Sequence, residues 1–342
     1  MNLLFAAIAL LWASLFIGLL LHIIIHEAGH LVCGLISGYT FVSFTVGNLM
    51  LIKENGKLKI KKFGIAGAGG QCLMSPPELK NNSYPFVLYN LGGGLMNFLF
   101  SVGSVVLFVA LKGAFSFAGE VFLPFAGVGV MLGAVNLLPL KMGGVALDGH
   151  NIVSLRKREQ ARRAFWLVLT AHAQMALGGR CKDFPSEWFE LSENYDFNNP
   201  VLANAAAMGL SRLIDSHDFN GAKILAEKIL NKGDKLIELL KNEVRCELLF
   251  LEIIGEPCQT ARQEKADRLY TSELSKYIKA SKTQLSKHRL MYAYEKLVSR
   301  DAQKEEKAFE AFQKACRAYP FSGDRESERE LMEIVDNIVA SE

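Results

Sequence analysis

Apolar residues gather in three long runs without charged side chains, all within the first 140 residues of the chain. The runs cover residues 3–25, 86–111 and 121–140. A helix that crosses the hydrocarbon core of a bilayer needs about 20 apolar residues, so each run is long enough. We predict three transmembrane helices at about residues 3–37, 86–111 and 121–140, because the first helical pattern continues through HEAGHLVCGLI.

A cleaved signal peptide is the alternative for the first run. The run is longer than the apolar core of such a peptide, and no Lys or Arg precedes it. We therefore expect an uncleaved span. A fourth apolar stretch, at 165–177, is short and contains His172 and Gln174. We interpret it as a soluble or interfacial helix, because a fourth span would export the segment that follows.

Basic residues are distributed unevenly around the three runs. The charged residues of the link between the second and third runs are only Lys112 and Glu120. The segments before the second run and after the third run are strongly basic. Since Lys and Arg accumulate on the cytoplasmic side, both basic segments are expected there. The pattern predicts an integral, multi-pass protein of the plasma (inner) membrane with its N-terminus outside and its C-terminal half in the cytoplasm. The basic residues are Lys53, Lys57, Lys59, Lys61, Lys62 and Lys80 before the second run, and Arg156, Lys157, Arg158, Arg162 and Arg163 after the third.

Amphipathic patterns rich in Lys, Glu, Arg and Ala replace the apolar runs in the second half. This change predicts a boundary between a membrane domain at 1–155 and an all-helical cytoplasmic domain at 156–342. Ala, Leu and Phe recur there at three- and four-residue intervals, as expected for helices with one buried face. The predicted helices are 201–217, 221–231, 234–254, 259–281, 284–299, 302–318 and 324–340.

The segment 305–320 looks like the end of a tetratricopeptide-type repeat, although no clean 34-residue period is present. We predict a helical, tetratricopeptide-like array. Such arrays bind proteins or peptides along a concave face, so a protein partner is expected for this domain. The alternative is a plain helical bundle that stabilises the rest of the chain.

A small β-hairpin is predicted at about 41–65, between the first two spans. β-Branched and aromatic residues dominate its first half, and Asn55-Gly56 is a strong signal for a two-residue turn. Lysines then alternate with Leu58 and Ile60, the period of a strand. An edge of this hairpin could pair with an extended substrate. A surface hairpin without a role is the alternative.

Charge and cysteine content exclude several other classes of protein. The net charge is only +3, and no basic tract with interleaved aromatic residues is present, which argues against a nucleic-acid partner. The six cysteines are scattered without a C-x-x-C pair, so neither a disulfide framework nor a zinc ribbon is expected. Free thiols in a reducing compartment are the simpler interpretation.

The end of the first span carries His26-Glu27-Ala28-Gly29-His30, which matches H-E-x-x-H. Residues four apart share one face of a helix, so His26 and His30 can bind one Zn²⁺. Glu27 can then act as general base toward a zinc-activated water. A chance match is the alternative, but ionisable groups in membrane segments are costly and usually functional. The motif therefore predicts a zinc site.

A catalytic zinc needs a third protein ligand and an open position. Asp148 lies just beyond the third span, on the same predicted cytoplasmic side as the H-E-x-x-H motif. We predict that Asp148 is the third ligand; the alternative is an aspartate that caps a helix or stands in a turn. His22, one turn before His26, is expected to bond a neighbouring helix.

Three motifs together resemble the site-2 protease family of intramembrane zinc metalloproteases. They are HEAGH at 26–30, NLLPLKMGGVALDG at 136–149, and Gly92-Gly93-Gly94-Leu95-Met96-Asn97. The resemblance covers roughly 1–155. Two departures stand out: Gly94 replaces the usual proline, and the stretch before Asp148 is longer, as if 141–146 were an insertion. The resemblance implies that His26, His30 and Asp148 bind Zn²⁺, that Glu27 is the base, and that Asn97 and Asn136 hold the substrate or polarise the scissile carbonyl.

The fold expected from these observations is mostly α: a three-helix transmembrane metalloprotease core with a small β-hairpin, then the helical domain. The resemblance implies regulated intramembrane proteolysis, the hydrolysis of a peptide bond in or near the transmembrane segment of a membrane-protein or signal-peptide substrate. The alternative is a membrane-anchored helical scaffold with a vestigial metal site. Three spans without an inverted repeat argue against a transporter. Each asparagine could instead bond to a neighbouring helix.

Overall fold

The three apolar runs form helices α1 (Asn2–Ile36), α2 (Val87–Leu111) and α3 (Ala118–Leu137) in the computed structural model. The structure describes residues 2–54, 56–64, 69–115, 117–142, 145–192 and 194–341. Among these residues, the three helices are the ones long and apolar enough to cross a membrane. The third was predicted to end at residue 140 but ends at Leu137, because the backbone of Leu138, which precedes a proline, is extended.

Two compact units make up the chain, Met1–Arg162 and Arg163–Glu342, and each is described by itself. The composition change places the boundary at 155–156, within helix α4 (Asp148–Lys157). Helix α5 (Glu159–Ala176) contains the division at 162–163 and also includes the apolar stretch 165–177 except for its last residue.

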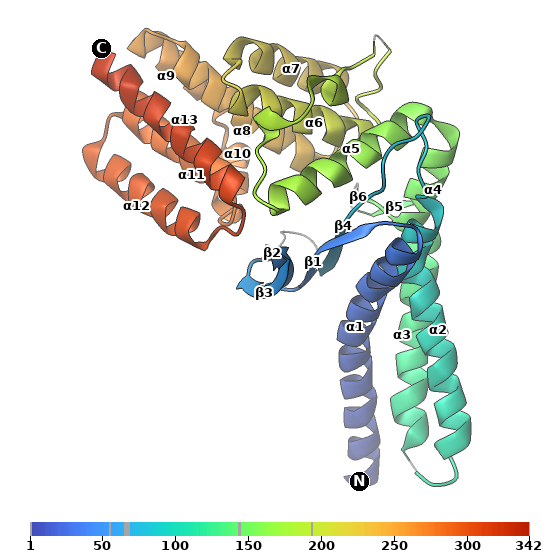
Figure 1. Cartoon of the computed structure of the whole chain (residues 1–342). Helices are drawn as coiled ribbons and strands as arrows, with labels where there is room; N and C mark the ends of the chain where they lie inside the picture. Colours follow the sequence, from blue (N-terminus) through green and yellow to red (C-terminus); the bar gives the residue numbers. More distant parts are fainter. Residues whose placement is uncertain are drawn as a thin grey trace. The chain divides into compact units, whose positions relative to one another are not determined.

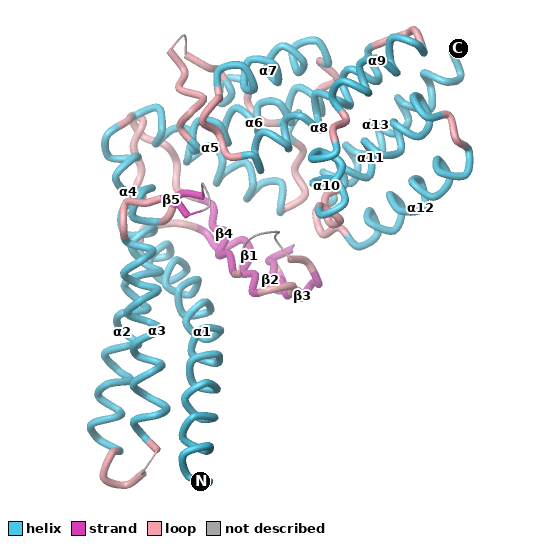
Figure 2. Tube along the Cα trace, turned by 180° about the vertical axis from the view of Figure 1, so that it is seen from behind, coloured by secondary structure: helices cyan, strands magenta, loops and turns pink. Residues whose placement is uncertain are grey.

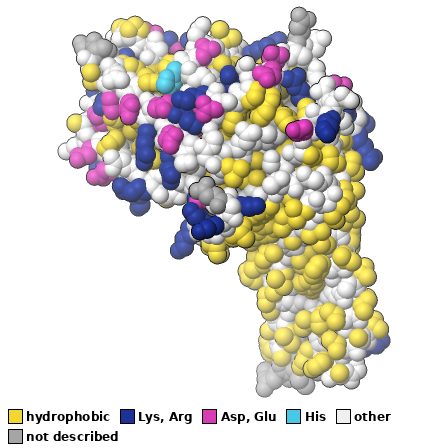
Figure 3. All heavy atoms as spheres, in the orientation of Figure 1, with side chains coloured by type: hydrophobic (Ala, Val, Ile, Leu, Met, Phe, Trp, Pro, Cys, Tyr) yellow, Lys and Arg dark blue, Asp and Glu magenta, His cyan; other side chains and the backbone are white. Residues whose placement is uncertain are grey.

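Helices α1, α2 and α3 run side by side in the first unit (Figure 1). Glycines allow α1 and α2 to approach backbone to backbone: a Cβ on Gly29 would lie 2.2 Å from the carbonyl oxygen of Gly92. Apolar side chains cover much of the face of the three helices that Figure 3 shows, and Trp12 and Phe16 are more than 60% exposed. Such an exposed apolar surface fits a lipid environment better than water.

A four-stranded antiparallel sheet contains the predicted hairpin and extends it. Its strands are β1 (Thr40–Val46), β2 (Leu49–Glu54), β3 (Lys57–Lys62) and β4 (Gly70–Ser75), in the order β3-β2-β1-β4. The predicted hairpin is present as β2 and β3, which pair antiparallel with Glu54 opposite Lys57. The sheet has two further strands because Gly47, with a φ of 58°, begins a turn that divides the first predicted strand into β1 and β2, and because β4 pairs with β1. Asn55 and Ile65 of the predicted hairpin lie outside the described residues, while Gly56 has a φ of 77°.

The apparent insertion before Asp148 folds back on itself. Strands β5 (Lys141–Met142) and β6 (Val145–Ala146) pair antiparallel, and the backbone N–H of Leu147 donates to the carbonyl oxygen of Leu140 at 3.2 Å. The two ends of the extra segment are therefore joined. As a result, α4 begins close to the end of α3 despite the longer connection.

The second unit is an array of helices joined by short loops (Figure 2). Two 3-10 turns, Cys181–Asp183 and Ser186–Phe189, follow α5. The helices after them are α6 (Pro200–Asp215), α7 (Phe219–Lys232), α8 (Glu238–Gly255), α9 (Gln259–Leu269), α10 (Ser272–Ala280), α11 (Leu285–Tyr294), α12 (Ala302–Ala318) and α13 (Ser322–Ser341). One π-helical turn, Glu295–Ser299, extends α11.

A continuous apolar core from Phe197 to Val335 connects these helices. The single helix predicted at 259–281 is two helices, because the side chain of Thr271 accepts a hydrogen bond from the backbone N–H of Leu274 and begins α10. Arg289, 1% exposed, pairs with Glu247 and Glu328 inside this core. The tetratricopeptide-like character of the array stays a prediction.

Candidate metal centre

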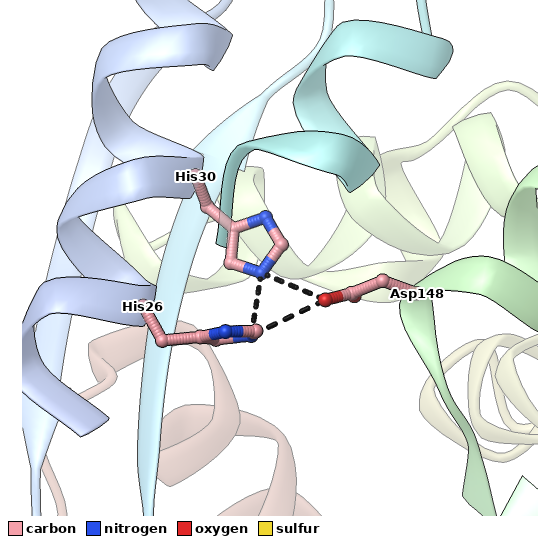
Figure 4. A group of neighbouring side chains, drawn as sticks. All are labelled: His26, His30 and Asp148. Carbon is pink, nitrogen blue, oxygen red and sulfur yellow. Dashed lines mark hydrogen bonds and ion pairs between the residues drawn. The ribbon is translucent and has the colours of Figure 1, made fainter. Parts of the chain in front are cut away.

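Three side chains from two helices converge in the first unit. His26 and His30 project from one face of α1, one turn apart, and Asp148 is the first residue of α4 (Figure 4). Their facing atoms are His26 Nε2, His30 Nε2 and Asp148 Oδ2. The two nitrogens are 3.2 Å apart, and they lie 3.2 and 3.4 Å from Oδ2, respectively.

The spacing of these three atoms fits a zinc ion. Ligand atoms about 2.0–2.1 Å from a tetrahedral zinc lie about 3.3–3.4 Å from one another, close to the three distances observed. Oδ2 of Asp148 is also a buried atom without a hydrogen bond of normal geometry among the described residues. A cation among these atoms would satisfy it. The donor set of two imidazoles and one carboxylate is one that catalytic zinc sites use.

The outer nitrogen of each histidine also has a partner. Nδ1 of His30 donates to the backbone carbonyl of Tyr89 on α2 at 2.8 Å, so Nε2 is the nitrogen that would bind the metal ion. Nδ1 of His26 lies 3.3 Å from the side-chain amide of Asn97. Partners of this kind fix the ring orientation of metal-binding histidines.

Close packing and charge hold Asp148 at this position. A Cβ on Gly149 would lie 2.1 Å from the carbonyl oxygen of Leu137, so glycine is needed where α4 meets the end of α3. Burial raises the pKa of Asp148, but the neighbouring imidazoles of His26 and His30 outweigh this effect and hold that pKa at about 2. The side chain is therefore a carboxylate at neutral pH.

Glu27 lies beside the edge strand β4. The backbone N–H of Cys72 donates to its Oε2 at 2.7 Å, and the hydroxyl of Tyr89 donates to the carbonyl oxygen of Cys72 at 3.2 Å. Burial and the charge of Glu27 raise the pKa of the Cys72 thiol to about 12. The thiol therefore stays protonated at neutral pH.

The two predicted substrate asparagines have different surroundings. Asn97 is 0% exposed and lies between His26 and His22. Asn136 is half-buried near the end of α3, and its side-chain nitrogen donates to the carbonyl of Leu132 at 2.9 Å. Only Asn97 contacts the His26 side chain. Substrate binding by either residue stays a prediction.

Sequence reasoning missed two groups that contact the site. Tyr89 contributes its backbone carbonyl to His30, and Cys72 contributes its backbone N–H to Glu27. Main-chain groups leave no pattern in side-chain chemistry, so no motif could have identified them. His22 was expected to bond another helix, and its Nε2 is 3.1 Å from the carbonyl oxygen of Phe125 on α3.

No model of a protein family, no curated protein and no solved structure matches the chain. The interpretation of the site therefore depends on its own geometry and on the sequence motifs.

Proposed function

We propose that the chain is an intramembrane zinc endopeptidase of the site-2 protease type. It would hydrolyse a peptide bond in or near the transmembrane segment of a membrane-protein or signal-peptide substrate. The observation that carries this proposal is the triangle of His26 Nε2, His30 Nε2 and Asp148 Oδ2, with sides of 3.2–3.4 Å, beside Glu27. The triangle lies in a unit that contains three helices long and apolar enough to cross a membrane.

His26, His30 and Asp148 would hold the zinc ion in this proposal. A zinc ion with three protein ligands supplies a Lewis acid that activates water at neutral pH. Glu27 would accept the proton of the attacking water and pass it to the leaving amine. The N–H of Cys72 orients the carboxylate of Glu27 while its second oxygen remains available for that proton transfer.

The edge of β4 is the proposed place for the substrate backbone. Within the described residues, β4 pairs with β1 on one side and has no strand on the other. The backbone groups of Cys72 point away from β1, toward Glu27 and Tyr89. An extended substrate segment paired along this side would pass close to the proposed base. Prolines along β4 should stop cleavage, whereas prolines along β3, the opposite edge, should leave it intact.

The proposed orientation follows from the basic segments around the spans. The N-terminus would lie outside, the metal centre near the cytoplasmic face, and the second unit in the cytoplasm of a cell whose plasma (inner) membrane holds the protein. The helical unit would bind a protein partner or select substrates. Labelling of single cysteines from each side of sealed vesicles tests the orientation.

The decisive experiment measures zinc content and cleavage of transmembrane reporter substrates by the purified full-length protein. Glu27→Gln should keep one zinc per chain and lose cleavage, because only the proton acceptor changes. Asp148→Ala should lose both, because one ligand is gone. Glu120→Gln is the matched control, since Glu120 lies in the first turn of α3, far along that helix from Asn136.

The outcomes separate two classes of function. Zinc in the wild type together with cleavage lost in Glu27→Gln supports the peptidase. A folded wild type without zinc contradicts it. Suppose instead that the protein binds a partner without cleaving it, and that this binding is unchanged in Glu27→Gln and Asp148→Ala. That result would support a membrane-anchored scaffold.

A further inference from the structure

Two buried polar side chains lie behind the metal centre, His22 on α1 and Asn97 on α2. Both are 0% exposed. A buried polar group without a hydrogen-bond partner is costly, so almost all such groups in folded proteins are paired. The partners of these two residues therefore determine which atoms carry protons.

The first step concerns His22. Its Nε2 lies 3.1 Å from the carbonyl oxygen of Phe125. A carbonyl oxygen only accepts, so Nε2 must carry a proton. A second proton on the ring would bring a positive charge into the helix bundle, and the described residues form no ion pair with His22. The neutral ring then has an acceptor at Nδ1.

The second step concerns the amide of Asn97. In this structure its Oδ1 lies 3.1 Å from Nδ1 of His22 and its Nδ2 lies 3.3 Å from Nδ1 of His26. A neutral His22 has a single N–H. In that orientation its other nitrogen, an acceptor, would therefore face another acceptor, either Oδ1 of Asn97 or the carbonyl oxygen of Phe125. The oxygen and nitrogen of a side-chain amide are nearly the same size and occupy equivalent positions. The orientation of the Asn97 amide is therefore assigned from its hydrogen-bond network. Turned by half a rotation, Asn97 donates to His22 and accepts from His26.

We propose that His22 and Asn97 are positioning residues that fix the tautomer of His26 for metal binding. In this hydrogen-bond chain, His22 donates from Nε2 to Phe125, Asn97 donates to Nδ1 of His22, and His26 donates from Nδ1 to Asn97. Nε2 of His26 is then a lone pair directed at His30 and Asp148. The inference depends on the proposed function, because it assigns His26 as a zinc ligand.

Steric packing keeps both imidazoles of this chain in place. A Cβ on Gly129 of α3 would lie 2.2 Å from Cε1 of His22, and a Cβ on Gly93 of α2 would lie 2.4 Å from Cε1 of His26. Glycine therefore stands at both points where another residue would enter the space of a ring. Neither ring can move toward the glycine that it faces without displacing α3 or α2.

The test compares zinc affinities of the purified full-length protein in competition with a chromogenic chelator. His22→Leu removes the acceptor for Asn97 and should weaken zinc binding by about 10–100-fold, the usual effect of losing an outer partner of a metal ligand. His22→Asn can place its side-chain oxygen where Nδ1 was, so it should stay within a few-fold of wild type. Ser104→Ala is the control, because Ser104 on α2 also donates to α3, to the carbonyl oxygen of Phe122 at 2.9 Å.

A second measurement reads the tautomer directly. Nitrogen NMR of zinc-loaded, histidine-labelled protein, in which Nε2 of His26 no longer faces a bare carboxylate of Asp148, should show the proton of His26 on Nδ1 with the shift of a hydrogen-bonded N–H in the wild type, and a weakened hydrogen bond at that proton in His22→Leu. A wild-type proton on Nε2 would overturn the inference, even if the leucine variant did not fold. Equal zinc affinity in wild type and His22→Leu would also overturn it while leaving the peptidase proposal intact. Absence of zinc from the wild type would overturn the peptidase proposal, and the inference with it.

Discussion

The backbone N–H of Cys72 on β4 donates a hydrogen bond of 2.7 Å to Oε2 of Glu27 on α1. This bond connects the proposed base to the strand along which the substrate is proposed to lie. Gly70 of the same strand also approaches Glu27, since a Cβ there would lie 2.8 Å from Cγ. The position of β4 therefore determines where the carboxylate stands.

Gly70→Ala should displace the carboxylate of Glu27 and leave the metal ligands in place. Because a misplacement of about 1 Å can cost about 100-fold in rate, we expect a large loss of reporter cleavage at unchanged zinc content. Gly69→Ala is the matched control, since its Cβ would meet only Ile23, at an ordinary 3.4 Å. Equal losses in the two variants would contradict a role for β4 in placing Glu27.

The crossing of α1 and α2 gives a second prediction. Gly29 and Gly92 face each other, and a Cβ on Gly92 would lie 2.4 Å from the carbonyl oxygen of Gly29. Gly29→Ala should push the helices apart, destabilise the protein by about 1–3 kcal/mol and weaken zinc binding. Thermal unfolding and zinc content measure the two effects. Gly103→Ala, on α2 but with open space around its Cβ, should change neither.

The two asparagines provide a third prediction, because only Asn97 contacts a proposed zinc ligand. Asn97→Leu should lower zinc affinity. Asn136→Ala should keep zinc bound but raise the KM for a reporter substrate, if Asn136 holds substrate as predicted. Zinc titrations and cleavage kinetics of both variants distinguish the two roles. If Asn97→Leu bound zinc as tightly as the wild type but had a raised KM, Asn97 would be assigned to substrate binding, like Asn136.

Local spacing in the sequence was sufficient to predict the histidine pair. One helical turn sets the distance between His26 and His30, and apolar composition alone predicts the three long helices. Asp148 was predicted because it follows the third run on the same predicted side. Its approach to within 3.2 Å of His26 depends on the pairing of Leu140 with Leu147, which no local pattern indicates.

Several of the remaining features depend on contacts between distant segments. Strand β4 is stabilised by pairing with β1, and its own sequence, GQCLMS, has little strand character. The break between α9 and α10 does have a local signal, since Thr271 precedes Ser272-Glu273 as a helix cap would. The partner of His22 is a backbone carbonyl on another helix, so sequence alone indicates only that some helix bonds it.

The second unit contains a half-buried acid, Asp324, whose protonation should be visible in the stability of the protein. Burial raises the pKa of Asp324 to about 7; a hydrogen bond from the hydroxyl of Tyr319 opposes this shift, and the nearby charges of Glu328 and Asp215 add to it. In the unfolded chain the pKa of the same carboxyl is about 3.9. Between these two pH values the folded protein keeps a proton that the unfolded chain has released.

Stability should therefore fall as the pH rises from about 4 to about 7 through this group, and stay level above. Asp324→Asn removes the charge and keeps an acceptor for Tyr319. The variant should gain stability over wild type at pH 8, on the order of a few kcal/mol, and gain little at pH 4. Thermal unfolding of the full-length protein, followed by the fluorescence of Trp166 and Trp188 in the second unit, measures this difference. The control is Glu326→Gln at an exposed neighbouring position, which should show no such pH dependence. An equal gain of stability in Asp324→Asn at pH 4 and pH 8 would contradict the prediction, because it would mean that Asp324 is ionised in the folded protein at both pH values.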